Sequence, residues 1–143
     1  MRSSSLVSTL APLAAVGVLL FAAAPAQAED VRVTVIVSHA SAKQGPMEQP
    51  KLLPPGFNFQ SHRVLQSETL TIGMNQEAKH RLPNGKSLKL RPTEKREKNL
   101  MMHVEVEGAT VSNLRMRSGK RVTIRHPEPY QGGNLLVHLE ARF

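Results

Sequence analysis

The sequence predicts an all-β protein, with an antiparallel β-sandwich as the expected architecture and a small β-barrel as the alternative. About eight short segments alternate apolar and polar residues, and turn residues separate them at a spacing of roughly ten residues. Beyond residue 28, no segment has the apolar periodicity of a helix of normal length. The chain has 143 residues, which is enough for a single domain with one small core.

The first 28 residues have the features of a bacterial signal peptide. A basic start, Met1-Arg2, precedes an apolar run from Leu6 to Ala24, and Ala26-Gln27-Ala28 forms a small-x-small cleavage site. The run is near the minimum of roughly 18 residues for a membrane-spanning helix, but the cleavage site favours removal. We therefore expect a single mature domain, residues 29–143, that is exported to the periplasm or secreted and has no transmembrane segment.

The clearest strand is residues 31–37, which alternate and are almost entirely β-branched. Their odd-numbered positions are expected to face the core. Residues 38–61 follow as a long connection, because closely spaced prolines exclude a long helix, although one helical turn fits between Met47 and Leu53. Since this connection carries several apolar residues, we expect it to lie across an end or a face of the sheet.

The rest of the chain predicts consecutive hairpins. Asn84-Gly85 lies between two alternating runs and predicts a type I′ turn, in which both central residues have positive φ. Residues 126–131 are expected to form a proline-bearing loop. The expected strands are residues 63–74, 78–82, 87–91, 99–107, 110–117, 121–125 and 135–143.

Three short motifs support the same fold. Ser38-His39-Ala40-Ser41 follows the first strand, residues 82–88 read Leu-Pro-Asn-Gly-Lys-Ser-Leu, and Gly132-Gly133 opens a terminal strand. In these features the chain resembles a group of short, signal-bearing, β-rich bacterial proteins without an assigned function. The resemblance spans most of the mature chain, although the segment after the first strand is shorter and richer in proline here. It implies a β-rich fold and export, and it supplies no catalytic residue.

Composition excludes several kinds of site. The chain has no cysteine, which excludes disulfides, thiolate nucleophiles and Cys-ligated metals. Asp30 is the sole aspartate, so aspartate-rich calcium loops and paired-aspartate chemistry are excluded as well. We expect no cofactor.

The chain is strongly basic, with a formal net charge of +8. Basic residues recur at even spacing on several expected strands, which places them on one face of the sheet. We expect this face to bind an anionic partner, either an anionic envelope component or an acidic protein surface. Simple solvation of the outer face and protection of strand edges are the alternative explanation. The candidate residues are Lys79, Arg81, Lys89, Arg91, Arg115, Arg117, Arg121 and Arg125.

Two acidic residues and the scarcity of aromatic residues limit this interpretation. Glu105 and Glu107 are expected to pair with Arg115 and Arg117 across a hairpin at Gly108, which would neutralise part of the basic face. The chain has one Tyr, four Phe and no Trp. Because base stacking needs aromatic side chains, we expect no nucleic acid as partner.

A copper site is the main metal hypothesis, since thioether and imidazole ligands suit Cu(I). Met101-Met102-His103, Met116 and His126 are its candidate residues. No His-x-His or His-x-x-x-His pair is present, and Met102 and His103 point to opposite faces of a strand. Surface histidines and core methionines are therefore favoured over a metal site.

Catalysis is not expected. No Gly-x-Ser-x-Gly or Ser-x-x-Lys motif is present, and His39, between Ser38 and Ser41, is the nearest approach to a nucleophile with a base. Serines directly after a strand more often cap a turn.

The sequence thus favours an exported, non-catalytic β-sandwich of the bacterial envelope that acts as a binding or assembly module. A small periplasmic metal- or ligand-binding protein is the first alternative. A small outer-membrane barrel is the second, because the last strand alternates apolar residues up to Phe143, although the scarce aromatic residues argue against it. The sequence does not predict the oligomeric state.

Overall fold

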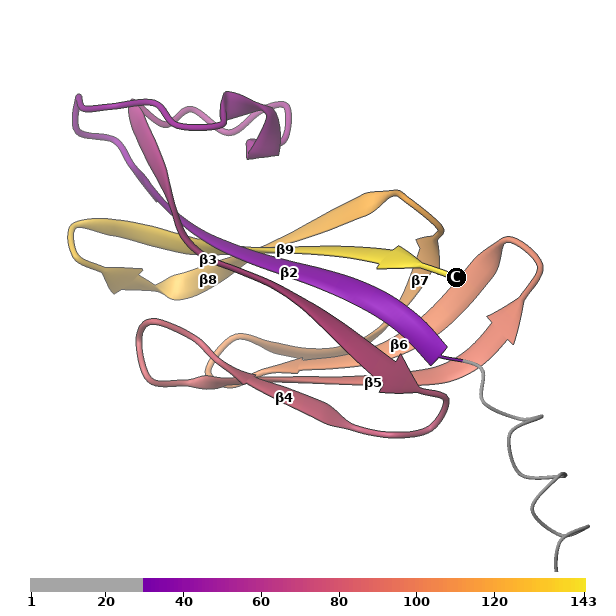
Figure 1. The fold of residues 1–143 in the computed structure, drawn as a ribbon. Helices are drawn as coiled ribbons and strands as arrows, with labels where there is room; N and C mark the ends of the chain where they lie inside the picture. Colours follow the sequence, from indigo (N-terminus) through magenta and orange to yellow (C-terminus); the bar gives the residue numbers. More distant parts are fainter. Residues whose placement is uncertain (1–29) are drawn as a thin grey trace, which may run out of the picture.

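The structure is a computed structural model that describes residues 30–143, and the expected signal peptide, residues 1–28, lies outside the described residues. The described chain folds into eight strands and one short 3₁₀ turn, η3 (Pro50–Leu52) (Figure 1). The strands are β2 (Asp30–Ser41), β3 (Ser61–Gly73), β4 (Ala78–Arg81), β5 (Ser87–Arg96), β6 (Asn99–Val106), β7 (Thr110–Arg117), β8 (Arg121–Tyr130) and β9 (Gly133–Arg142).

The eight strands form two four-stranded sheets. The first sheet has the strand order β3-β2-β9-β8 and the second has the order β4-β5-β6-β7, and all neighbouring strands are antiparallel. Figure 1 shows the two sheets stacked on each other. Of the two architectures expected from the sequence, the sandwich is therefore the correct one.

The core lies between the two sheets and follows the two-residue periodicity of the strands. Val31, Val33, Val35 and Val37 of β2 are fully buried, as their odd-numbered positions predict. Their counterparts in the rest of the core are Ile72, Leu82, Leu88, Leu90, Leu100, Met102, Val104, Val106, Met116, Leu135, Val137, Leu139 and Ala141.

Histidines join the two sheets at both open sides of the sandwich. At one side, His80 of β4 contacts two residues of β3. Its Nδ1 is 2.8 Å from the Glu68 carboxylate, and its Nε2 is 2.8 Å from the Gln66 side-chain oxygen. At the other side, His126 of β8 donates from Nε2 to the carbonyl oxygen of Glu107, 3.0 Å away, which follows the end of β6. These side-chain hydrogen bonds connect two sheets that are not paired with each other through backbone hydrogen bonds.

Residues 42–60 cover part of the outer face of the first sheet, as expected for an apolar connection. Leu52 of η3 is only 4% exposed. Arg121 of β8 donates to the Lys51 carbonyl oxygen, and the Arg125 guanidinium lies 5.2 Å from the centre of the Phe59 ring. The predicted helical turn is present but spans only Pro50–Leu52.

Several local predictions are wrong. β2 continues to Ser41 and β5 to Arg96, past the expected strand ends at residues 37 and 91. Residues 126–130 continue β8 instead of forming a loop. Pro127 falls in an irregularity of the β8–β9 pairing between Arg125 and Pro129, and proline is tolerated at such bulges and on an edge strand such as β8. The turn at Asn84-Gly85 is not type I′, since within residues 30–143 the positive φ angle falls on Gly85 and not on Asn84. Pro83 fixes the conformation of a type I turn, in which the Gly85 amide donates to the Leu82 carbonyl oxygen at 2.9 Å.

Candidate functional site

The structure places six of the eight predicted basic residues on the outer face of the second sheet. On β5, Lys89 and Arg91 alternate with the buried Leu88 and Leu90, so the basic side chains point away from the core. On β7, Arg115 and Arg117 flank the buried Met116 in the same way. We call the six residues the basic face: Lys79, Arg81, Lys89, Arg91, Arg115 and Arg117.

Like charges lie next to each other on the basic face. Lys79 of β4 is directly opposite Lys89 of β5 in the strand register. Like charges at directly opposed positions destabilise a sheet. Two ion pairs of the described chain lie on this face: Lys89 Nζ is 3.9 Å from a Glu105 carboxylate oxygen, and Arg96 is 2.8 Å from the Glu94 carboxylate, of which only the first involves one of the six residues. The face thus remains strongly positive.

The expected ion pairs across the Gly108 hairpin are wrong. The register of β6 and β7 places Arg115 opposite Met101 and Arg117 opposite Asn99, while Glu105 lies opposite Val111. Glu107 instead accepts hydrogen bonds from the backbone N–H and the hydroxyl of Ser87, at 2.9 and 3.2 Å. The hydrogen bond from the Ser87 backbone, followed by that from its hydroxyl, lowers the pKa of Glu107. Neither glutamate therefore neutralises the arginines of β7.

The remaining two predicted residues, Arg121 and Arg125, lie elsewhere. They belong to β8, which is in the first sheet, because the turn after β7 carries the chain from one sheet to the other. Both side chains contact the connection of residues 42–60, as described above, and Arg125 also donates to the Asn134 side-chain oxygen at 3.0 Å. These two residues hold the covering segment and do not extend the basic face.

A buried chain of polar side chains lies beneath residues 42–60. The Ser38 hydroxyl is 2.8 Å from His138 Nε2, and the Thr123 hydroxyl is 2.9 Å from His138 Nδ1. Burial, followed by the charges of His62 and Arg121, lowers the pKa of His138 to about 4. His138 is therefore neutral at pH 7.

The Ser38–His138 pair was not foreseen, because even positions on the two central strands of the sheet predict a solvent-facing location. Ser38 pairs with His138 and not with the adjacent His39, since neighbouring residues of a strand point to opposite faces. Ser38 is fully buried. In a catalytic triad the histidine is held by a carboxylate, whereas His138 is held by the Thr123 hydroxyl. The arrangement satisfies buried polar groups and offers no access to a substrate.

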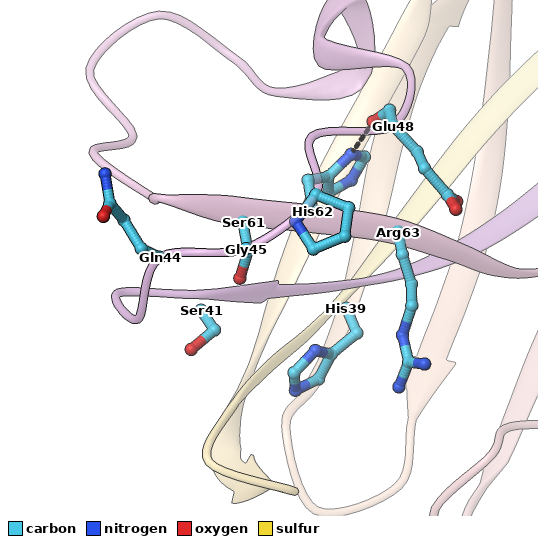
Figure 2. Close-up of a pocket in the computed structure, with 9 residues that line it drawn as sticks. His39, Ser41, Gln44, Gly45, Glu48, Ser61, His62 and Arg63 are labelled. Atoms are coloured by element: carbon cyan, nitrogen blue, oxygen red, sulfur yellow. Dashed lines mark hydrogen bonds between the residues drawn. The ribbon is translucent and has the colours of Figure 1, made fainter.

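A small cavity lies where β2 ends and β3 begins, with a volume of about 290 Å³ (Figure 2). His39 and Arg63 are directly opposite each other in the register, and Ser41 is opposite Ser61 two residues further on. Gln44, Gly45, Pro46 and Glu48 line the cavity on the side of the connection. Sequence analysis singled out His39 and Ser41 only as catalytic candidates and missed Arg63, because no local motif reveals which residue lies opposite in a hairpin closed by a long connection.

The candidate copper ligands are not brought together. Met102 and Met116 are buried in the core, whereas His103 lies on the outer face with Nδ1 3.0 Å from the Asn113 side-chain oxygen. Among residues 30–143, no group of three His, Cys, Asp or Glu side chains is placed to hold a metal ion.

The prediction of core methionines is thus correct for Met102 and Met116. The prediction of surface histidines is wrong for four of the six, because hydrogen bonds to backbone and hydroxyl groups allow the neutral ring to be buried. The four buried histidines are His39, His62, His126 and His138.

Comparisons of the chain with protein-family models, with curated proteins and with solved structures found no match. The resemblance to the exported β-rich group therefore stays an expectation from the sequence. In the described part of the chain, no helix has the length and apolarity needed to span a membrane.

Proposed function

We propose that this protein is an exported, non-catalytic binding or assembly module of the bacterial envelope whose basic face contacts an anionic partner. The observation that carries the proposal is the gathering of six basic side chains on one face of the second sheet, of which one, Lys89, forms an ion pair with an acidic residue within residues 30–143. Closely spaced charges of one sign raise the local potential and attract an oppositely charged surface.

The sheet fixes the positions of these charges. Adjacent strands lie roughly 4.8 Å apart, and side chains on one face recur roughly every 7 Å along a strand. The basic groups on β4, β5 and β7 therefore form an array, with β6 contributing Met101 and His103 between them. An anionic partner would also relieve the repulsion between the opposed Lys79 and Lys89.

The partner is recognised through charge and not through stacking. Residues 78–117, which include the whole second sheet, contain no Phe, Tyr or Trp. A face without aromatic residues offers no platform for nucleotide bases. Phosphate and carboxylate groups of an envelope lipid or polysaccharide fit this chemistry.

Retention of the purified protein on a heparin matrix and on anionic phospholipid vesicles tests the proposal. We expect binding to both at low salt and loss of binding before ~0.5 M salt, because the Debye length is then only a few ångströms. The double variant Arg115→Gln/Arg117→Gln should elute at a clearly lower salt concentration than the unmodified protein.

The matched control removes two charges from outside the second sheet, in the variant Arg32→Gln/Lys43→Gln. Both side chains are exposed, and we expect this variant to elute close to the unmodified protein. Salt-independent retention, or an equal loss in the control, would contradict a role of the basic face. The matrix from which the protein elutes at the higher salt concentration then tells a lipid surface from a polysaccharide.

A further inference from the structure

We infer that the cavity at the end of β2 and β3 binds a small hydroxylated carboxylate, of the size of a monosaccharide acid. This site is separate from the basic face, because it belongs to the first sheet and lies beside the connection of residues 42–60 (Figure 2). Its volume of about 290 Å³ is at the lower end of the range of small-molecule sites. This volume suits one small molecule.

Arg63 supplies the positive charge of the site. Its side chain is exposed, and within residues 30–143 no acidic group lies in ion-pair distance of it. Glu48, the acidic residue that lines the cavity, is engaged by the backbone N–H of Val64, which donates to its carboxylate at 3.1 Å. The planar guanidinium is therefore available for a carboxylate, which it binds with two parallel hydrogen bonds.

His39 supplies an acceptor beside this charge. Its Nε2 lies 2.8 Å from the Tyr130 carbonyl oxygen, and since a carbonyl oxygen only accepts, Nε2 carries the hydrogen. In the neutral ring, Nδ1 is then an acceptor without a hydrogen. An acceptor next to a cation matches a ligand that carries a hydroxyl next to its carboxylate.

The hydroxyl groups of the next pair extend the polar lining. Ser41 Oγ donates to the Gly132 carbonyl oxygen at 3.3 Å and accepts from the Lys43 backbone N–H at 3.1 Å, which fixes its orientation. Ser61 and Gln44 line the same cavity, and neither side chain has a hydrogen-bond partner in the part of the chain that is described. These groups can donate to or accept from further ligand hydroxyls.

Two of the binding groups are held in place before a ligand arrives. His39 packs edge-to-face against Tyr130, with ring centres 6.0 Å apart, and Ser41 is held by its two hydrogen bonds. The ladder of β2 and β3 fixes the backbone of Arg63 opposite His39, so that only its exposed side chain has to be ordered on binding.

Titration of the purified protein with sodium D-glucuronate, followed by calorimetry and by the side-chain NMR signals of His39 and Arg63, tests the inference. D-glucose is the control for charge, because it has the same sugar ring without the carboxylate. Inorganic phosphate is the control for the sugar, because it is an anion without a hydroxylated carbon ring. All titrations are done at the same ionic strength. We expect saturable binding of glucuronate and affinity about tenfold lower for glucose, because one charge-assisted contact is lost.

Variants identify the groups responsible. Arg63→Gln should lower the affinity for glucuronate about tenfold or more, and Ser61→Ala by a smaller factor of roughly three. Arg32→Gln, an exposed arginine of the same sheet that does not line the cavity, is the matched control and should bind as the unmodified protein does.

Three outcomes would overturn the inference. They are equal binding of glucose and glucuronate, binding of phosphate as tight as that of glucuronate, and unchanged affinity in Arg63→Gln. If Arg63→Gln does not fold, the ligand series and Ser61→Ala still decide the matter. Since Arg63 is not part of the basic face, loss of salt-sensitive retention leaves this test unaffected.

Discussion

His126 is fully buried and donates from Nε2 to the Glu107 carbonyl oxygen, so one imidazole connects the edge of the first sheet to the β6–β7 turn of the second. Its other nitrogen, Nδ1, accepts from the backbone N–H of Glu128 at 3.2 Å. A backbone N–H only donates, so Nδ1 is the acceptor and Nε2 the donor of this ring. Both ring nitrogens are thereby used for backbone groups of two different sheets.

Replacing His126 by Phe should lower the free energy of unfolding by about 2 kcal/mol. The ring volume is nearly kept, but two backbone groups lose their partners at a buried position. Urea unfolding of the variant and the unmodified protein measures the difference. His103→Phe is the control, because His103 is half-buried and bonds only to the exposed Asn113, and we expect a change below about 0.5 kcal/mol there.

Stability should fall as the pH drops from about 6.5 to about 4, owing to His138. The folded-state pKa of this residue is lowered to about 4 from 6.5, so between these values the unfolded chain binds a proton that the folded protein does not. Above pH 6.5 both states are neutral at this position, and no loss is expected. The loss at pH 4.5 should be about 2 kcal/mol, allowing for partial screening by solvent.

Urea unfolding at pH 7.0, 5.5 and 4.5 measures this loss, and His138→Gln should flatten the profile over this interval. Glu107 contributes in a different interval, since its pKa is lowered from 4.5. The stabilisation from this carboxylate is present above pH 4.5 and is lost at lower pH. A profile that is level between pH 7.0 and 4.5 in the unmodified protein would contradict the assignment to His138.

Gly133→Ala should destabilise the protein by about 3 kcal/mol. A Cβ atom at this position would lie 2.3 Å from the Ala40 carbonyl oxygen and 2.8 Å from His39 Nε2. Gly85→Ala is the comparison, because its Cβ would meet nothing within 4 Å and only the positive φ of 84° is unfavourable. We expect about 1 kcal/mol for Gly85→Ala, and thermal unfolding that ranks the two variants in the reverse order would refute the steric argument.

Leu52→Ala should loosen the segment of residues 42–60 from the first sheet. Leu52 is nearly fully buried, and its truncation removes apolar contacts worth about 2 kcal/mol. Cleavage by trypsin after Lys51 should become faster while the rest of the domain stays resistant. Leu53→Ala, at a half-buried position, serves as the control, and equal cleavage rates of the two variants would contradict the proposed role of Leu52.

Most of the fold was predictable because strand periodicity is a local property. The valines of β2 sort to one face in the sequence, and the structure buries all four. Where the prediction failed, tertiary structure decided the outcome: Pro127 and Pro129 are tolerated because β8 is an edge strand and its pairing with β9 is irregular between Arg125 and Pro129.

The candidate sites were predictable to a lesser degree for the same reason. Alternation correctly placed Arg115 and Arg117 on an outer face, yet it gave no information on whether β7 and β8 share a sheet. The burial of His138 depends on coverage by residues 42–60, and the pairing of His39 with Arg63 depends on how the ends of β2 and β3 meet. Contacts of this kind are set by tertiary structure.

The neighbours β2 and β9 also constrain the order of assembly. Ser38 and His138, which bond to each other on these two central strands, are separated by 100 positions along the chain. During synthesis, β4 to β7 complete their sheet from contiguous hairpins, whereas β2 pairs with β3 on one edge and must wait on its other edge for β9, made about a hundred residues later. A high contact order slows folding and leaves unpaired strands accessible to aggregation. The first sheet should therefore be the late-folding part, and the interval before β9 is synthesised is when this chain has most need of a chaperone.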